Sequence, residues 1–233
     1  MVSKSPSTME KAGYKKIRDT CTMAQTRGQQ WAWIGTCCID KSSSAELTES
    51  INSMYRWYQK AEECYAYLLD FAPGSLPKVE LGKCRWFTRG STLQELIAPK
   101  TVIFFARDWS IVGEKSREDT LEIINRLTVF RKTDCTIAQR MIWASNRETT
   151  RPEDKAYCSL GIFEVNMPLI YGEGDNAFRR LQEEIIKRSN DLSIFAWGTP
   201  INVEPAKHEK GLAKNNSLGY SSLSISVTSW KAE

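Results

Sequence analysis

The chain has 233 residues, of which 41% are hydrophobic and 26% are charged, and 32 basic against 28 acidic side chains give a net charge of +4. This is the balance of an ordinary soluble globular protein, and so mild an excess of positive charge does not predict a nucleic-acid-binding protein. His208 is the single histidine, which excludes zinc sites that need two or three histidines. Carboxylates, cysteines or backbone groups must therefore carry any catalysis, and we expect no metal site.

The cysteines and the absence of targeting signals bear on the compartment. There are seven cysteines, none in a C-x-x-C pair and most within apolar stretches, which predicts buried free thiols in a reducing compartment. The polar N-terminus lacks the apolar core of a secretion signal, and no apolar run approaches the ~18 residues of a membrane span. We therefore expect a cytoplasmic protein without a membrane span.

The first half of the chain predicts helices alternating with short strands, after a polar and disordered N-terminus at residues 1–12. Apolar spacing of three and four residues indicates helices, and short aromatic or β-branched runs indicate strands. The expected elements are a helix over 14–27, a strand WAWI (31–34), a helix over 46–60, a strand CYAYLLD (64–70), a short helix over 93–97 and a strand TVIFFA (101–106).

The second half is more helical. The expected elements there are helices over 116–130, 150–161 and 176–189, a strand SIFAW (193–197) and a loosely ordered tail over 198–233. TVIFFA is continuously apolar, as in a strand covered on both faces. Strands alternating with helices predict an α/β fold with a mainly parallel sheet, in one domain over residues 13–197.

Four sequence blocks carry a resemblance to a known family. They are CCIDKSSSAELTESINSMYRWY (37–58), RWFTRGSTLQELIAP (85–99), TTRPEDKAYCSLGIF (149–163) and NMPLIYGEGDNAFRRLQEEI (166–185). In this order and spacing they resemble the fungal heterokaryon-incompatibility (HET) domain, in the form that opens vegetative incompatibility proteins with nucleotide-binding and WD-repeat regions. The resemblance implies a role in programmed cell death when unlike strains fuse. It also implies a fold similar to Toll/interleukin-receptor (TIR) domains, of which the first strand is apparently missing here.

The TIR resemblance points to one candidate catalytic residue. TIR enzymes that cleave NAD carry a glutamate followed by leucine on a short helix, and STLQEL (91–96) is similar to that stretch, which makes Glu95 the analogue of the catalytic carboxylate. A carboxylate can stabilise the oxocarbenium-like state of N-glycosidic cleavage. The alternative for Glu95 is an ordinary helix charge that faces solvent or pairs with a nearby arginine.

Four further residues are candidates for binding the nucleotide, each with a structural alternative. Trp33 could line the pocket or belong to the core. Asp40 could face the pocket or serve as a turn residue before the serines. Arg85 and Arg89 could hold phosphates bidentately, or form ion pairs with Asp70 or Glu95.

Two classes of function follow from the resemblance. In the first, the domain is a signalling or assembly effector that associates with itself or with other incompatibility or death-signalling proteins. In the second, it is an NAD glycohydrolase, with NAD as substrate and no bound cofactor, or an inactive copy of one. The missing first strand favours the assembly effector, because an incomplete pocket can still leave interaction surfaces intact.

Overall fold

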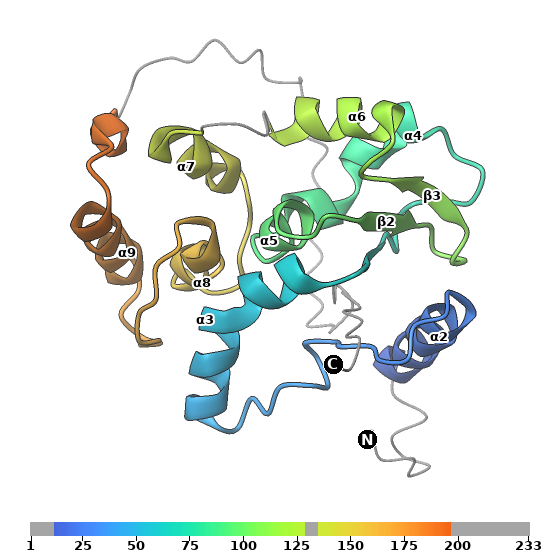
Figure 1. The fold of residues 1–233 in the computed structure, drawn as a ribbon, viewed down its shortest axis with the longest axis horizontal. Coiled ribbons are helices and arrows are strands. Elements are labelled where there is room, and N and C mark those ends of the chain that lie inside the picture. Colours follow the sequence, from blue (N-terminus) through green and yellow to red (C-terminus); the bar gives the residue numbers. More distant parts are fainter. Residues whose placement is uncertain (1–11, 129–134, 197–233) are drawn as a thin grey trace.

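The described part of the chain is about half helical, and its helices surround one small sheet (Figure 1). The computed structural model describes residues 12–128 and 135–196. Its α-helices are α2 (Ala12–Thr26), α3 (Ser44–Lys60), α4 (Pro77–Glu80), α5 (Thr92–Ile97), α6 (Glu118–Thr128), α7 (Ile137–Ser145), α8 (Asp154–Tyr157) and α9 (Asn176–Arg188). Its 3₁₀ helices are η1 (Leu81–Lys83), η2 (Arg85–Thr88), η3 (Leu160–Ile162) and η4 (Leu192–Phe195). The mixed content confirms the predicted α/β class.

The sheet has three strands in the order β1 (Cys64–Tyr67), β2 (Val102–Phe105) and β3 (Ile111–Glu114). Strands β1 and β2 are parallel, as their intervening helices predict, with Cys64 opposite Val102. Strand β3 was not predicted, and it runs antiparallel to β2. The sheet is therefore half parallel and half antiparallel in its pairings, which corrects the prediction of a mainly parallel sheet.

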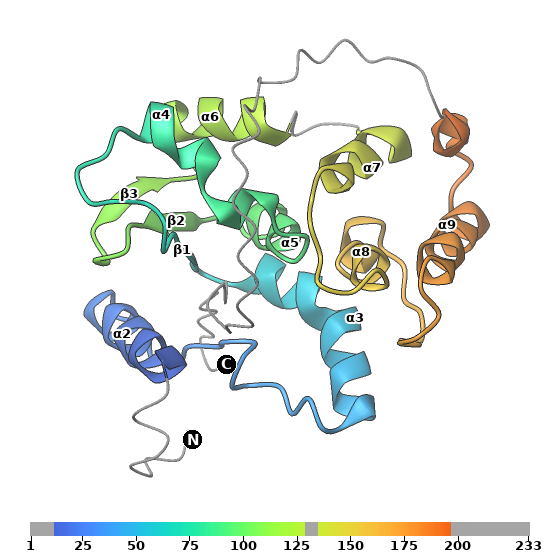
Figure 2. The ribbon, with the colours of Figure 1, turned by 180° about the vertical axis from the view of Figure 1, so that it is seen from behind.

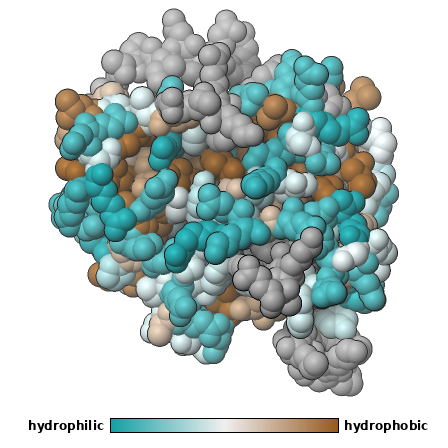
Figure 3. Space-filling view, in the orientation of Figure 1, coloured by the Kyte–Doolittle hydropathy of each residue, from teal (hydrophilic) through white to brown (hydrophobic). Residues whose placement is uncertain are grey.

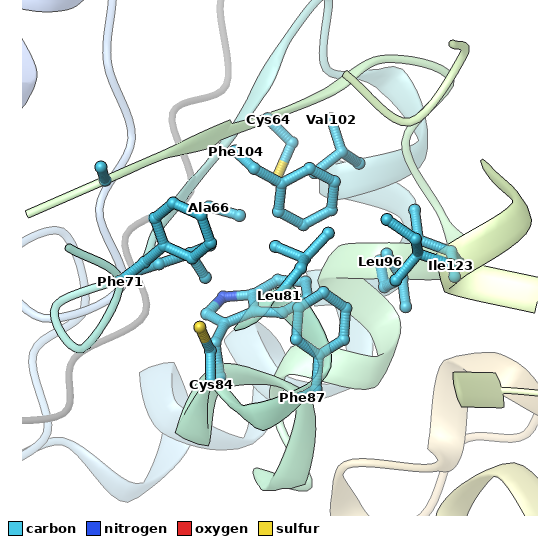
Figure 4. Close-up of a cluster of buried hydrophobic side chains, with 14 of the residues drawn as sticks. Cys64, Ala66, Phe71, Leu81, Cys84, Phe87, Leu96, Val102, Phe104 and Ile123 are labelled. Carbon is cyan, nitrogen blue, oxygen red and sulfur yellow. The ribbon is translucent and has the colours of Figure 1, made fainter. Parts of the chain in front are cut away.

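Both faces of β1 and β2 are covered, as predicted for TVIFFA. Alternate residues of the two strands point to opposite sides, and Tyr65, Ile103 and Phe105 pack beneath α2 with Ala24. The opposite side packs on η1, η2, α5 and α6 (Figure 4). Its buried members include Cys64, Ala66, Val102, Phe104, Leu81, Trp86, Phe87, Leu96, Ile123 and Ile124. These side chains exclude water from both faces, so hydrophobic burial holds the sheet between helices on each side.

A third cluster of buried side chains, apart from those on the two faces of the sheet, lies in the helical part built from α7, α8, η3, α9 and η4. Figures 1 and 2 both place these helices to one side of the molecule and the sheet to the other, with α5 between them. Helix α5 contributes to both clusters, because Leu96 packs against the sheet side while Leu93 packs with Tyr157, Leu160 and Leu181. A short helix thus joins two of the three clusters of buried side chains.

The segment WAWI does not form a strand, so the expectation that it shares the sheet with β1 and β2 is wrong. Ile34 is buried, but Trp31 is 62% exposed. The carbonyl of Ile34 accepts hydrogen bonds from the backbone N–H groups of Cys37 and Cys38, at 3.0 and 2.9 Å. These hydrogen bonds engage the carbonyl of Ile34 in a turn. The carbonyl therefore does not pair with a neighbouring strand of a sheet.

Two predictions for the second half also need correction, and one helix there was not predicted. The segment SIFAW contributes to η4 instead of a strand, because Asp191 caps it by accepting from the N–H of Ser193. The expected helix over 150–161 is two short pieces, α8 and η3. Helix α7 was not predicted, although Thr136 and Gln139 form its capping box. Residues 1–11, 129–134 and the tail from 197 lie outside the described residues.

Candidate functional site

Glu95 lies on α5, the helix that packs into both the cluster on the η1–α6 side of the sheet and the helical cluster. The hydroxyl of Thr92 donates to the carbonyl of Arg89 at 2.8 Å and also to the carbonyl of Trp86, which fixes the first turn of the helix. The helix is short and its residues are buried from Thr92 to Leu96, and Glu95 is only 4% exposed. The alternative that Glu95 faces solvent is therefore wrong.

The carboxylate of Glu95 is surrounded by polar groups from distant parts of the chain. The hydroxyl of Tyr58, at the end of α3, donates to Glu95 Oε1 at 3.3 Å. Two cations are close enough to interact with it electrostatically, Lys16 on α2 and Arg147 after α7. We call Lys16, Tyr58, Glu95 and Arg147 the Glu95 cluster.

The two cations of this cluster show the effect of burial. Burial lowers the pKa of Lys16 to about 8 and that of Arg147 to about 10, and the Glu95 carboxylate opposes both shifts by favouring the charged forms. Arg147 Nη1 donates to the carbonyl of Arg89 at 2.9 Å and to the hydroxyl of Thr92 at 3.0 Å. Glu95 is thus the counter-ion for charges that would otherwise be costly to bury.

Two of the predicted nucleotide-binding residues lie beside this cluster. Trp33 makes edge-on contacts with Trp57 and Tyr58, at ring-centroid distances of 5.3 and 5.9 Å. Trp33 thus contacts Tyr58, and the hydroxyl of Tyr58 in turn donates a hydrogen bond to Glu95. Arg89 joins the cluster through its backbone, since its carbonyl oxygen accepts from Arg147. The arrangement brings Trp33, Arg89 and Glu95 into one region.

Asp40 and Arg85 have local structural contacts instead. Asp40 is exposed, and its carboxylate accepts from the N–H and the hydroxyl of Ser42, while its own N–H donates to Glu46 Oε1 at 2.8 Å. These hydrogen bonds hold the turn before α3. Arg85 is also exposed, and its backbone N–H donates to Asp70 Oδ2 at 2.8 Å. The contact with Asp70 is a helix-end hydrogen bond and not the expected guanidinium ion pair.

Sequence reasoning missed three members of the Glu95 cluster. Tyr58 lay on the predicted apolar face of the helix over 46–60. A buried tyrosine hydroxyl usually has a hydrogen-bond partner, so the sequence did indicate that Tyr58 would contact a polar group. Lys16 and Arg147 carried no such signal. They approach Glu95 only through the packing of α2 and of the segment after α7, and Lys16 lies 79 positions before Glu95 in the sequence.

A second polar cluster surrounds the glycine-punctuated segment YGEG (171–174). Buried Glu153 accepts from the backbone N–H groups of Gly172 and Gly174 at 2.8 and 3.0 Å. Glu173 pairs with Arg180, whose Nε donates to Oε2 at 2.9 Å. Both glycines have positive φ, +101° and +59°, which favours glycine. These contacts give Glu153 a structural role, that of fixing the turn before α9.

The hydrogen bonds of Glu153 predict a loss of stability in acid. Its own N–H and those of Gly172 and Gly174 lower its pKa. The unfolded chain therefore binds this proton more readily, so the stabilisation is present above the ordinary pKa near 4.3 and is lost as pH falls through the lowered value. We expect Glu153→Gln to flatten the fall in unfolding free energy below about pH 5.

Chemical denaturation between pH 3 and 7 measures this effect. The matched control is Glu122→Gln, which alters an exposed glutamate on α6 and should keep the wild-type pH dependence. Equal pH dependence in Glu153→Gln and wild type would show that the glutamate does not anchor the turn.

Comparisons with known proteins identify the family. The family model described as heterokaryon incompatibility protein (HET) matches residues 8–83, and a domain of unknown function (DUF8212) matches residues 176–228. The vegetative incompatibility protein HET-E-1 of Podospora anserina is 41% identical over 221 residues, which cover 89% of this chain and 16% of that protein. The chain thus spans a small part of its relative's length. No solved structure matches.

Two features are absent from the described residues. Within residues 12–128 and 135–196, no helix combines the length and apolar character that crossing a bilayer requires. The same residues contain no group of three histidine, cysteine, aspartate or glutamate side chains placed to hold a metal ion.

The TIR-like arrangement and the role of Glu95 in NAD cleavage stay predictions. The family model over residues 8–83 and the 41% identity to HET-E-1 thus show that this chain carries a heterokaryon-incompatibility (HET) domain.

Proposed function

We propose that this chain is an effector module of vegetative incompatibility that triggers programmed cell death by associating with itself or with other incompatibility proteins. The HET domain and 41% identity to a vegetative incompatibility protein support the incompatibility role. The chain covers only 16% of that relative, so the proposal concerns this module and not the whole relative.

The position of Glu95 is the observation that favours association over hydrolysis. A carboxylate that assists glycosidic cleavage must reach the ribose in the transition state. Glu95 is instead 4% exposed, accepts a hydrogen bond from Tyr58 and balances the charges of Lys16 and Arg147. Its negative charge thus stabilises the contacts between α2, α3 and α5, which is a structural role.

The surface offers apolar side chains for association. In the space-filling view, hydrophobic residues show in several places between hydrophilic ones (Figure 3). Two of the exposed apolar side chains belong to η4, where Leu192 is 76% and Phe195 is 62% exposed. Exposed apolar side chains that lie this close in the chain provide area that a partner can bury.

Forced association in cells tests the proposal. The chain, fused to a domain that dimerises on adding a small molecule, is expressed in a filamentous fungus, and the viability of the cells is counted. The variant carrying Leu192→Asp and Phe195→Asp should kill less than the parent, because two charges replace the exposed apolar contacts. The dimerising molecule should restore its killing.

Two controls make the outcome decisive. The dimerising domain alone should leave viability unchanged, and both forms of the chain should accumulate equally by immunoblot. If the double variant kills like its parent, the η4 side chains do not contribute to association. If dimerisation fails to restore killing in a variant that has lost it, association is not the trigger and the proposed function is wrong.

A further inference from the structure

Cys37 and Cys38 are exposed, which corrects the expectation that the cysteines are buried. Cys64 and Cys84 are buried, as expected, but Cys21 on α2 is also exposed. The sulfur atoms of Cys37 and Cys38 are 4.0 Å apart. Two adjacent accessible thiols at this distance can react together, which a single surface cysteine cannot do.

The turn after Ile34 holds both sulfur atoms. The backbone N–H of Ile34 donates to Cys38 Sγ at 3.4 Å, and Cys37 Sγ donates to the carbonyl of Ile34 at 3.6 Å. The N–H groups of both cysteines donate to the same carbonyl. Ile34 is itself 1% exposed and packed on the sheet, so the thiols are presented from an anchored turn.

The two thiols are not equivalent. The contact with the Cys37 sulfur and the hydrogen bond that Cys38 Sγ accepts from the N–H of Ile34 favour the Cys38 thiolate and lower its pKa. The same sulfur–sulfur contact raises the pKa of Cys37, whose thiol donates to the carbonyl of Ile34. The thiolate is the nucleophile in cysteine oxidation, so Cys38 is the first to react and Cys37 is the resolving thiol.

We propose that Cys37 and Cys38 form a redox modification site, at which a peroxide converts the dithiol to a disulfide between the two adjacent residues. The Cys38 thiolate attacks one peroxide oxygen, the O–O bond breaks, and Cys38 becomes a sulfenic acid while hydroxide leaves and is protonated to water. The thiolate of Cys37 then attacks the Cys38 sulfur, the S–S bond forms, and the S–O bond breaks. The departing hydroxide takes the proton that Cys37 lost. Two thiols are oxidised and one peroxide is reduced to two waters.

The disulfide should be easy to reduce again. Adjacent Cα atoms are about 3.8 Å apart, shorter than the separation of about 4.4 Å or more that an unstrained disulfide spans. Strained and exposed disulfides are the labile kind found in regulation, and intracellular disulfides are commonly of this reversible type. The site therefore fits a reversible sensor of oxidants and not a structural bridge.

Peptide mass spectrometry tests the pairing directly. The full chain is treated with one equivalent of hydrogen peroxide, the remaining thiols are blocked with iodoacetamide, and the chain is digested with trypsin. Cleavage after Arg27 and Lys41 gives one peptide, residues 28–41, that contains both cysteines, whereas Cys21 lies in residues 19–27. We expect peptide 28–41 to be unalkylated, lighter by two hydrogen atoms, and fully alkylated after dithiothreitol.

Serine variants separate the two roles. Cys38→Ser should slow the reaction with peroxide by about tenfold or more. Cys37→Ser should stop at a sulfenic acid that dimedone traps on Cys38. Cys21→Ser is the matched control and should react like the wild type. Circular dichroism confirms that each variant is folded. A cross-link between peptides 19–27 and 28–41, or equal reactivity of Cys38→Ser and wild type, would overturn the proposal.

Discussion

Glu95→Gln should lower the free energy of unfolding by about 3 kcal/mol, because it leaves two buried or half-buried cations without their counter-ion. The amide keeps the size of the side chain and can still accept from Tyr58, so the loss reports charge and not packing. For a domain of this size, the melting temperature should fall by roughly 6–12 °C. Urea denaturation at pH 7 measures the free energy, and Glu122→Gln on the exposed face of α6 serves as the control.

Removal of one cation should reverse part of this loss. Lys16→Met keeps an apolar chain of similar length and removes the charge that burial opposes. In the Glu95→Gln background, Lys16→Met should raise the free energy of unfolding, whereas in the wild type it should lower it. The two substitutions should therefore show a coupling energy of about 1 kcal/mol or more. Additive effects of the two substitutions would show that Lys16 and Glu95 do not stabilise one another.

Gly161→Ala should destabilise the chain by about 3 kcal/mol or more. A Cβ atom built at Gly161 would lie 2.0 Å from the Cβ of Tyr55 and 2.5 Å from its Cγ. The nearest atom is bound to the backbone of α3, so a change of side-chain rotamer cannot relieve the clash, and η3 and α3 must move apart.

The same substitution elsewhere provides the control for Gly161→Ala. At Gly13, on α2, an added Cβ meets no atom within 4 Å, so Gly13→Ala should be neutral or stabilise the chain by up to about 1 kcal/mol. Thermal and urea denaturation compare the two variants. A wild-type melting temperature for Gly161→Ala would show that η3 does not pack against α3 as described.

The sequence predicted those elements whose burial follows one regular pattern along their whole length. Strands β1 and β2 are covered on both faces, so their runs are apolar throughout and were recognised. Helices α3 and α9 have apolar positions at helical spacing and were also recognised. Strand β3 was not, because Ile111 is exposed while Gly113 is buried, the reverse of the usual strand pattern.

The segment WAWI shows the limit of reasoning from composition. Its residues suit a strand as well as those of β1 do, but the carbonyl of Ile34 receives hydrogen bonds from the turn that follows. Only the three-dimensional arrangement decides between these uses. The candidate site has the same limit, since Glu95 was found from a local motif whereas Lys16 and Arg147 reach it through contacts between distant elements.

Incubation of the purified chain with NAD tests most directly whether Glu95 is structural and the domain acts by association. The protein is held at high concentration with NAD, and the release of nicotinamide is followed by chromatography over several hours. Our account predicts no release above that of buffer, for wild type and for Glu95→Gln alike. Sustained release by the wild type that Glu95→Gln abolishes, while the variant remains folded by circular dichroism, would contradict it and make Glu95 the catalytic carboxylate of a glycohydrolase.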